Sequence, residues 1–147
     1  MQAREYVNSS MAQRTECMFT EWKFAAALNI ACNLLQVPNF YQEQKEALRS
    51  FFKGKDLFFS VHTGYGKSLI FQAIPIIADV LREQIIGTST ALVISHLLSL
   101  MKDQISHVNK NFGICAAGIF DGQEEEIMRN IEDGVYSLLV KQHPKAC

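Results

Sequence analysis

Residues 61–68 read VHTGYGKS, and this stretch decides the fold. It follows the short apolar run DLFFSV at residues 56–61, which predicts a buried strand. It continues into GKSLIFQAI at residues 66–74, which has the pattern of a helix. A glycine-containing loop between a strand and a helix places backbone amides and the positive end of the helix dipole around an anion. The stretch therefore predicts a phosphate-binding loop.

The composition of this loop assigns a chemical role to each part. Two glycines permit positive φ and close approach of the backbone to phosphate, the lysine can reach β- and γ-phosphates, and the serine hydroxyl can ligate Mg²⁺. The predicted nucleotide-binding residues are Thr63, Gly64, Tyr65, Gly66, Lys67 and Ser68. Val61 occupies the first glycine position of the strict pattern G-x-x-x-x-G-K-[ST], so a glycine-rich turn with a chance Gly-Lys-Ser is the alternative.

The bulk properties indicate one globular domain. The chain has 147 residues, of which 48% are hydrophobic and 20% charged, and its net charge is −1. No general basic field draws it to nucleic acid or membrane, so any nucleic-acid contact must be local. No apolar run reaches the length of about 20 residues that spans a bilayer.

The cysteine pattern predicts reduced thiols in an intracellular protein. Four cysteines are scattered without a C-x-x-C pair, which argues against a zinc site or a disulfide framework. The amino-terminal residues 1–18 are polar and predict a disordered segment.

Two helices are expected before the loop. Residues 20–35 are apolar around most of the helix circumference, so this helix needs cover on more than one side. A second helix starts at Asn39, whose side chain can cap it with Gln42 three residues later, and Gly54 marks its end. Its apolar stripe consists of Phe40, Ala47, Leu48 and Phe51.

Strands and helices alternate after the loop. Pro75 is expected to kink the helix or start a new segment. The following elements are a strand at 91–95, a helix at 97–108, a strand at 113–120, an acidic helix at 124–134 and a strand at 135–140. This order predicts an α/β fold with a parallel sheet and helices on both faces. Ligands of such sheets bind beyond the carboxyl ends of the strands, where the loops after Val61 and Ile94 lie.

With its neighbouring segments, the loop resembles that of RecQ-type DNA helicases. FYQEQKEA at residues 40–47 is similar to the helix-opening signature of that family, and LVISHLLSLMKDQ at residues 92–104 resembles its motif Ia. The resemblance covers about residues 40–140. It implies that residues 19–147 form an incomplete RecA-like P-loop NTPase domain of an ATP-dependent 3′–5′ DNA helicase, a family that acts in recombination and repair.

The resemblance also implies site residues and ligands. Gln44 would bind adenine with its side-chain amide, and a core-edge glutamine bonded to backbone is the alternative. Ser95, Ser99 and Lys102 would lie near the phosphates of single-stranded or partly duplex DNA, and a solvated helix face is the alternative for Lys102. The cofactors would be ATP and Mg²⁺, with Lys67 contacting the phosphate during hydrolysis. In a eukaryote the location would be nuclear.

The chain departs from the family pattern at several positions. His62 and His96 replace common prolines, which predicts weaker nucleotide binding, and Tyr41 replaces a common arginine. The sequence has no D-E-x-H element after an apolar strand and no second RecA-like domain. We therefore expect this chain alone to have little ATP turnover. The alternatives are a non-catalytic interaction module with a relic loop and, less in accord with residues 99–104, another P-loop enzyme such as a small-molecule kinase.

Overall fold

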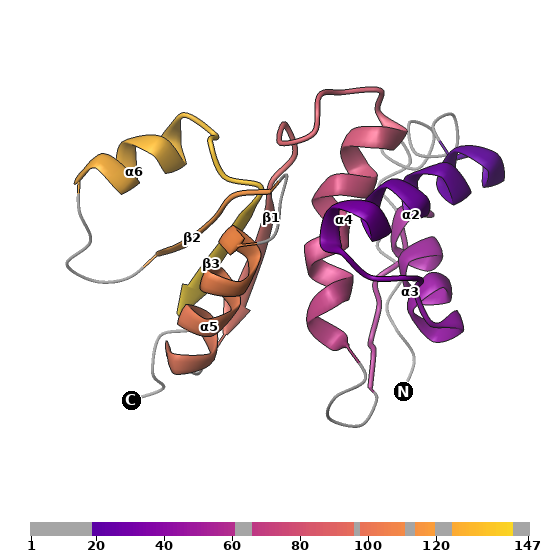
Figure 1. Ribbon diagram of the computed structural model, residues 1–147, viewed down its shortest axis with the longest axis horizontal. Helices are drawn as coiled ribbons and strands as arrows, with labels where there is room; N and C mark the ends of the chain where they lie inside the picture. Colours follow the sequence, from indigo (N-terminus) through magenta and orange to yellow (C-terminus); the bar gives the residue numbers. More distant parts are fainter. Residues whose placement is uncertain (1–18, 61–65, 96–97, 111–113, 120–124, 143–147) are drawn as a thin grey trace.

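The computed structural model of the chain describes residues 19–60, 66–95, 98–110, 114–119 and 125–142 (Figure 1). The segment 1–18, for which disorder was predicted, lies outside these residues. The elements in chain order are α2 (Glu21–Leu35), α3 (Gln42–Phe52), α4 (Lys67–Leu81), β1 (Ala91–Ser95), α5 (Leu98–Lys110), β2 (Ala116–Ile119), α6 (Glu125–Glu132) and β3 (Leu138–Gln142).

The three strands form a parallel sheet in the order β1-β3-β2, which confirms the predicted α/β fold class. β3 lies in the middle of the described strands, and its alternate residues Leu138 and Val140 are fully buried. β3 begins at Leu138, three residues later than the start expected from the sequence. The register pairs Ala91 of β1 and Ala116 of β2 with Leu138.

The two faces of the sheet are covered to different extents. Leu138 and Val140 point into one hydrophobic cluster with Met101 of α5, so α5 and α4 cover this face. The opposite face carries Leu92 and Ile94 of β1, which are 58% and 60% exposed. A parallel sheet normally has apolar cover on both faces. Among the described residues, this part of β1 is without that cover.

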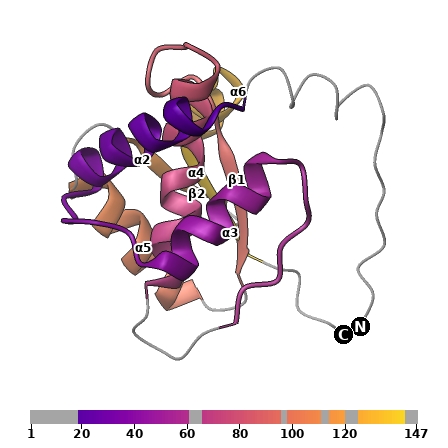
Figure 2. The ribbon, with the colours of Figure 1, turned by 90° about the vertical axis from the view of Figure 1, so that its right-hand side faces the viewer.

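Helix α4 is the most deeply buried helix of the described chain. It lies between the sheet and the pair α2 and α3, as Figures 1 and 2 show from two directions. Pro75, Ile76 and Ile77 are all buried. Pro75 does not start a new segment, because one helix runs from Lys67 to Leu81 through it, and the other expectation, a kink, stays a prediction. Burial of its neighbours offsets the cost of one missing backbone hydrogen bond.

Helix α2 packs with one side only. Its buried residues include Phe24, Leu28 and Leu35, whereas Trp22 is 70% exposed on the other side. The expectation of cover on more than one side is therefore wrong for the described residues. α2 is an outer helix that packs mainly on α4, and Arg49 of α3 lies over the ring of its buried Phe24.

Residues 56–60 do not form the strand that the apolar run predicted. Phe58 is 92% exposed, and the segment has no strand neighbour among the described residues. Val61 lies outside them. A strand must pair its backbone groups with a neighbouring strand, and local β propensity does not supply that neighbour.

Helix α3 starts two residues later than expected. Asn39 Oδ1 accepts the N–H of Phe40 at 2.9 Å, and the N-cap residue is Tyr41. The Tyr41 N–H donates to Gln44 Oε1 at 2.8 Å, so Gln44 performs the capping function expected of Gln42. The helix ends before Gly54, whose φ of 84° confirms the predicted stop. Of the predicted stripe only Phe51 is exposed.

The carboxyl group of Asp79 holds the connection from α4 to β1. Asp79 is fully buried, and its two oxygens accept the N–H groups of Gly87, Thr88 and Ser89 at 2.8–3.1 Å. A buried polar side chain is tolerated only when hydrogen bonds replace the lost water. These three bonds fix the path of the chain into β1.

Replacing Asp79 by asparagine keeps the side-chain size but directs an amide donor at backbone donors. We expect Asp79→Asn to lower the free energy of unfolding by about 1.5–3 kcal/mol, measured by urea denaturation. Glu132→Gln, at an exposed position, is the control and should change it by less than about 0.5 kcal/mol. Equal effects of the two substitutions would contradict this role of Asp79.

Candidate nucleotide-binding site

The amino-terminal end of α4 and the second turn of α5 come together beyond the carboxyl ends of the strands. Of the predicted phosphate loop, the structure describes Gly66, Lys67 and Ser68, whereas Thr63, Gly64 and Tyr65 lie outside the described residues. The departures at His62 and His96 also lie outside them.

Gly66 is the N-cap residue of α4 and requires glycine for two reasons. Its φ is 83°, in the left-handed region that side chains disfavour. A Cβ atom at this position would lie 2.8 Å from Gln44 Nε2. No side chain caps the helix here, and the Leu69 N–H donates back to the Gly66 carbonyl at 3.1 Å. This arrangement suits a bound anion.

Gln44 joins α3 to this helix end. Its side chain is only 1% exposed, its Oε1 accepts the Tyr41 N–H, and its Nε2 donates to the Gly66 carbonyl at 3.1 Å. Both contacts are hydrogen bonds to backbone, as in the alternative interpretation of Gln44 as a core-edge glutamine. They also place the amide directly beside the phosphate loop. The adenine-binding role of Gln44 stays a prediction.

Ser68 lies in the first turn of α4 and is half-buried, whereas Lys67 beside it is exposed. Gln104 of α5 donates its side-chain N–H to Ser68 Oγ at 3.3 Å. Gln104 was not among the predicted site residues. The sequence does contain a signal for Gln104, because it shares one face of the α5 helix with Met101 and Val108, which are fully buried. A glutamine on an apolar face needs a polar partner.

The residues predicted to contact DNA lie near this site, from the end of β1 into α5. Ser95 is the last residue of β1, and Ser99 and Lys102 are exposed in the first turns of α5. Lys102 and Gln104 are two positions apart, so they project to nearly opposite sides of the helix. These residues lie at the end of β1 and on α5, the helix that also carries Gln104 of the candidate site. Their contact with DNA stays a prediction.

The residues present fit a Mg²⁺-bound nucleotide phosphate. The uncapped helix start, the glycine cradle and the Ser68 hydroxyl supply the groups that such a ligand needs. In addition, the buried Gln104 Oε1 has no hydrogen-bond partner in the described structure. No group of three histidine, cysteine or acidic side chains that could hold a metal ion occurs among the described residues.

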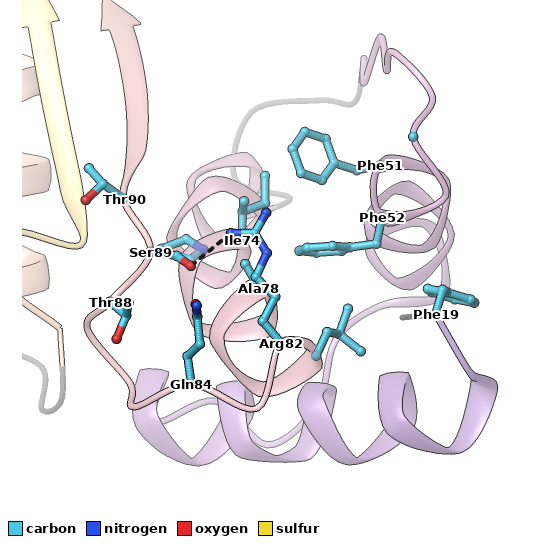
Figure 3. Close-up of a pocket in the computed structure, with 13 residues that line it drawn as sticks. Phe19, Phe51, Phe52, Ile74, Ala78, Arg82, Gln84, Thr88, Ser89 and Thr90 are labelled. Atoms are coloured by element: carbon cyan, nitrogen blue, oxygen red, sulfur yellow. Dashed lines mark hydrogen bonds between the residues drawn. The ribbon is translucent and has the colours of Figure 1, made fainter. Parts of the chain in front are cut away.

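A cavity of about 630 Å³ lies elsewhere, along the second half of α4 (Figure 3). Phe51 and Phe52 border it from α3, and Arg82 Nη1 donates to Ser89 Oγ at 3.5 Å across its wall. None of the predicted nucleotide or DNA residues lines this cavity. The candidate site is thus separate from this cavity.

The described thiols do not belong to the site. Cys32 is buried and Cys115 is exposed, and neither is in a disulfide. Burial raises the pKa of the Cys32 thiol, which disfavours its thiolate form. No helix among the described residues is both long and apolar enough to cross a membrane.

Comparison with known proteins identifies the family. Residues 41–146 match the DEAD/DEAH box helicase family. The chain belongs to this helicase family. The matched range begins in the cap of α3 and includes the phosphate loop, α4 and α5.

Its curated relatives within the helicase family are RecQ-type proteins. The ATP-dependent helicase SGS1 of Saccharomyces cerevisiae is 39% identical over 53% of this chain and 5% of its own length. The ATP-dependent DNA helicase RecQ of Haemophilus influenzae is 31% identical over 76% of this chain and 16% of its own length. The expected resemblance to RecQ-type helicases is confirmed. The chain spans only a small part of the length of these relatives.

The Gly66 geometry can be tested with a matched glycine. We expect Gly66→Ala to destabilise the fold more than Gly54→Ala. Both glycines have positive φ, but a methyl group at Gly66 would lie 2.8 Å from Gln44 Nε2, whereas one at Gly54 would have no atom within 4 Å. Gly54→Ala should cost about 1–2 kcal/mol from backbone strain alone. Urea denaturation measures both free energies of unfolding.

A double-mutant cycle isolates the contact with Gln44. In a Gln44→Ala background, Gly66→Ala should cost no more than Gly54→Ala does in the original chain. An excess cost of Gly66→Ala that persists without the Gln44 side chain would show that the clash lies elsewhere.

Proposed function

We propose that this chain binds a Mg²⁺-nucleotide and contacts single-stranded DNA as part of an ATP-dependent DNA helicase of the RecQ type. The observation that carries the proposal is the convergence of Gln44 from α3 and Gln104 from α5 on the first turn of α4. Two side chains from separate elements hold the start of a helix whose amides are uncapped. Such preorganisation serves anion binding better than packing alone.

Each residue has a chemical task in this proposal. Gly66 and the amides after it hold a phosphate, and Lys67, which is exposed, extends to the β- and γ-phosphates. Ser68 presents its hydroxyl to Mg²⁺, which neutralises phosphate charge when bound. Gln44 would contact adenine with the side-chain amide that also bonds to Tyr41 and Gly66.

The DNA contact is local and independent of base sequence. Lys102 and Ser99 are exposed on α5, and Ser95 ends β1 on the same rim. Hydroxyls and one cation suit contacts to phosphates, which position DNA without reading it. Through this contact the whole protein would act in unwinding, recombination and repair in the nucleus of a eukaryote.

Lys67 provides the direct test of nucleotide binding. We expect Lys67→Ala to weaken Mg-ATP binding about 10–100-fold, because it removes a charged hydrogen bond to phosphate. Isothermal titration calorimetry measures the affinity. Lys110→Ala, at the other end of α5, should leave the affinity unchanged. Absence of Mg-ATP binding by the original chain at millimolar concentration would instead favour an interaction module with a relic loop.

Turnover by the isolated chain should be low. The given sequence contains no D-E-x-H element, and the described residues contain no group of three histidine, cysteine or acidic side chains that could hold a metal ion. A phosphate-release assay with single-stranded DNA measures this. Robust release that Lys67→Ala abolishes would contradict the expectation of binding without turnover.

Lys102 provides the test of DNA contact. We expect Lys102→Ala to weaken binding of single-stranded oligonucleotides to a similar degree for all base compositions, and to reduce the slope of log affinity against log salt by about 0.7. Fluorescence anisotropy over a series of salt concentrations measures both. Lys110→Ala is the control on the same helix. Identical salt slopes for the original chain and Lys102→Ala would rule out a phosphate contact.

A further inference from the structure

The contact between Gln104 and Ser68 joins two helices that are distant in sequence. Gln104 Nε2 of α5 lies 3.3 Å from Ser68 Oγ of α4, and 36 positions separate the two residues. Ser68 is the residue proposed above to face Mg²⁺. Among the described residues, the side chain that bonds to the Ser68 hydroxyl is that of Gln104, which has no role in the proposed function so far.

The surroundings of Gln104 make its amide oxygen unusual. The residue shares an α5 face with Met101 and Val108, which are fully buried. Its Oε1 is buried and has no hydrogen-bond partner in the described structure. A buried acceptor without a partner costs about 1–3 kcal/mol. An apolar side chain of similar length would avoid this cost, so packing alone does not account for a glutamine at this position.

The chemistry of a hydroxyl ligand supplies a use for that oxygen. A serine hydroxyl has one proton and two lone pairs. When a lone pair faces a metal ion, the proton must point away, toward an acceptor. Rotation of the Gln104 amide by half a turn exchanges Nε2 with Oε1, a change that leaves its outline nearly the same. Oε1 then accepts the Ser68 proton, which leaves the lone pairs of Ser68 for a metal ion.

We propose that Gln104 is a positioning residue for Mg²⁺ in the nucleotide site: its amide oxygen accepts the Ser68 hydroxyl proton and so directs the oxygen of Ser68 to the metal. Residues that hydrogen-bond to a metal-ligating side chain commonly set its orientation in this way. The inference rests on the proposed nucleotide-binding function. It adds the residue that makes the affinity for nucleotide depend on Mg²⁺.

Two substitutions separate orientation from packing. Gln104→Met keeps the length of the side chain but removes the acceptor, and Gln104→Glu keeps an acceptor while removing the amide donor. Calorimetry with ATP, first in EDTA and then over a series of Mg²⁺ concentrations, yields the gain in affinity that Mg²⁺ provides. A substitution that only disturbed packing would change the affinity in EDTA and with Mg²⁺ by the same factor.

We expect Gln104→Met to reduce the Mg²⁺-dependent gain about 10-fold with little change in EDTA, the size typical of losing a partner behind a metal ligand. Gln104→Glu should keep the gain at or above that of the original chain. Gln84→Met, the same change at an exposed glutamine, should alter neither affinity. Thermal unfolding of each variant verifies that it is folded.

Different results would contradict the proposed nucleotide binding and the proposed role of Gln104. An unchanged Mg²⁺-dependent gain in Gln104→Met would overturn the role of Gln104 and leave nucleotide binding intact. If Gln104→Met does not fold, Gln104→Glu decides, and a 10-fold loss of the gain in that variant would overturn the role. If the original chain binds no ATP with or without Mg²⁺, the proposed function fails and the role of Gln104 fails with it.

Discussion

The burial of α4 is the constraint on which the rest of the described structure depends. The helix contacts α2, α3 and β1, and its residues Ile76 and Ile77 are completely buried. Because three elements use its surface as their core, its position cannot shift without loss of their packing. Asp79, on the same helix, fixes the chain into β1 through three backbone hydrogen bonds. One helix thus sets both the core and the entry to the sheet.

This burial also determines where the site lies. The amino-terminal turn of α4 emerges from the core at Gly66, and polar side chains reach it from two sides. Gln44 supports the helix start from α3, and Gln104 contacts Ser68 from α5. A helix end held in this manner loses little freedom when an anion binds, which lowers the cost of binding. The apolar core and the proposed phosphate site therefore meet on a single element.

The features that could be predicted from the sequence are those with strong local patterns. The strand at Ala91–Ser95, the helix that follows it and the stop at Gly54 were all expected at these places. The failures concern segments whose fate depends on distant neighbours. Residues 56–60 have strand propensity, yet no described strand pairs with them. Pro75 has a strong tendency to break a helix, yet packing against α2 and α3 keeps α4 continuous.

The sequence by itself determined the α/β class and membership of a helicase family, because short-range patterns and motif spacing encode both. The phosphate-binding role of Gly66, Lys67 and Ser68 stays a prediction from the same patterns. Only the tertiary structure decided the strand order β1-β3-β2, the exposed face of β1 and the contact of Gln104 with Ser68. These features join residues far apart in the chain. Their energies come from packing and desolvation at contacts that no local pattern specifies.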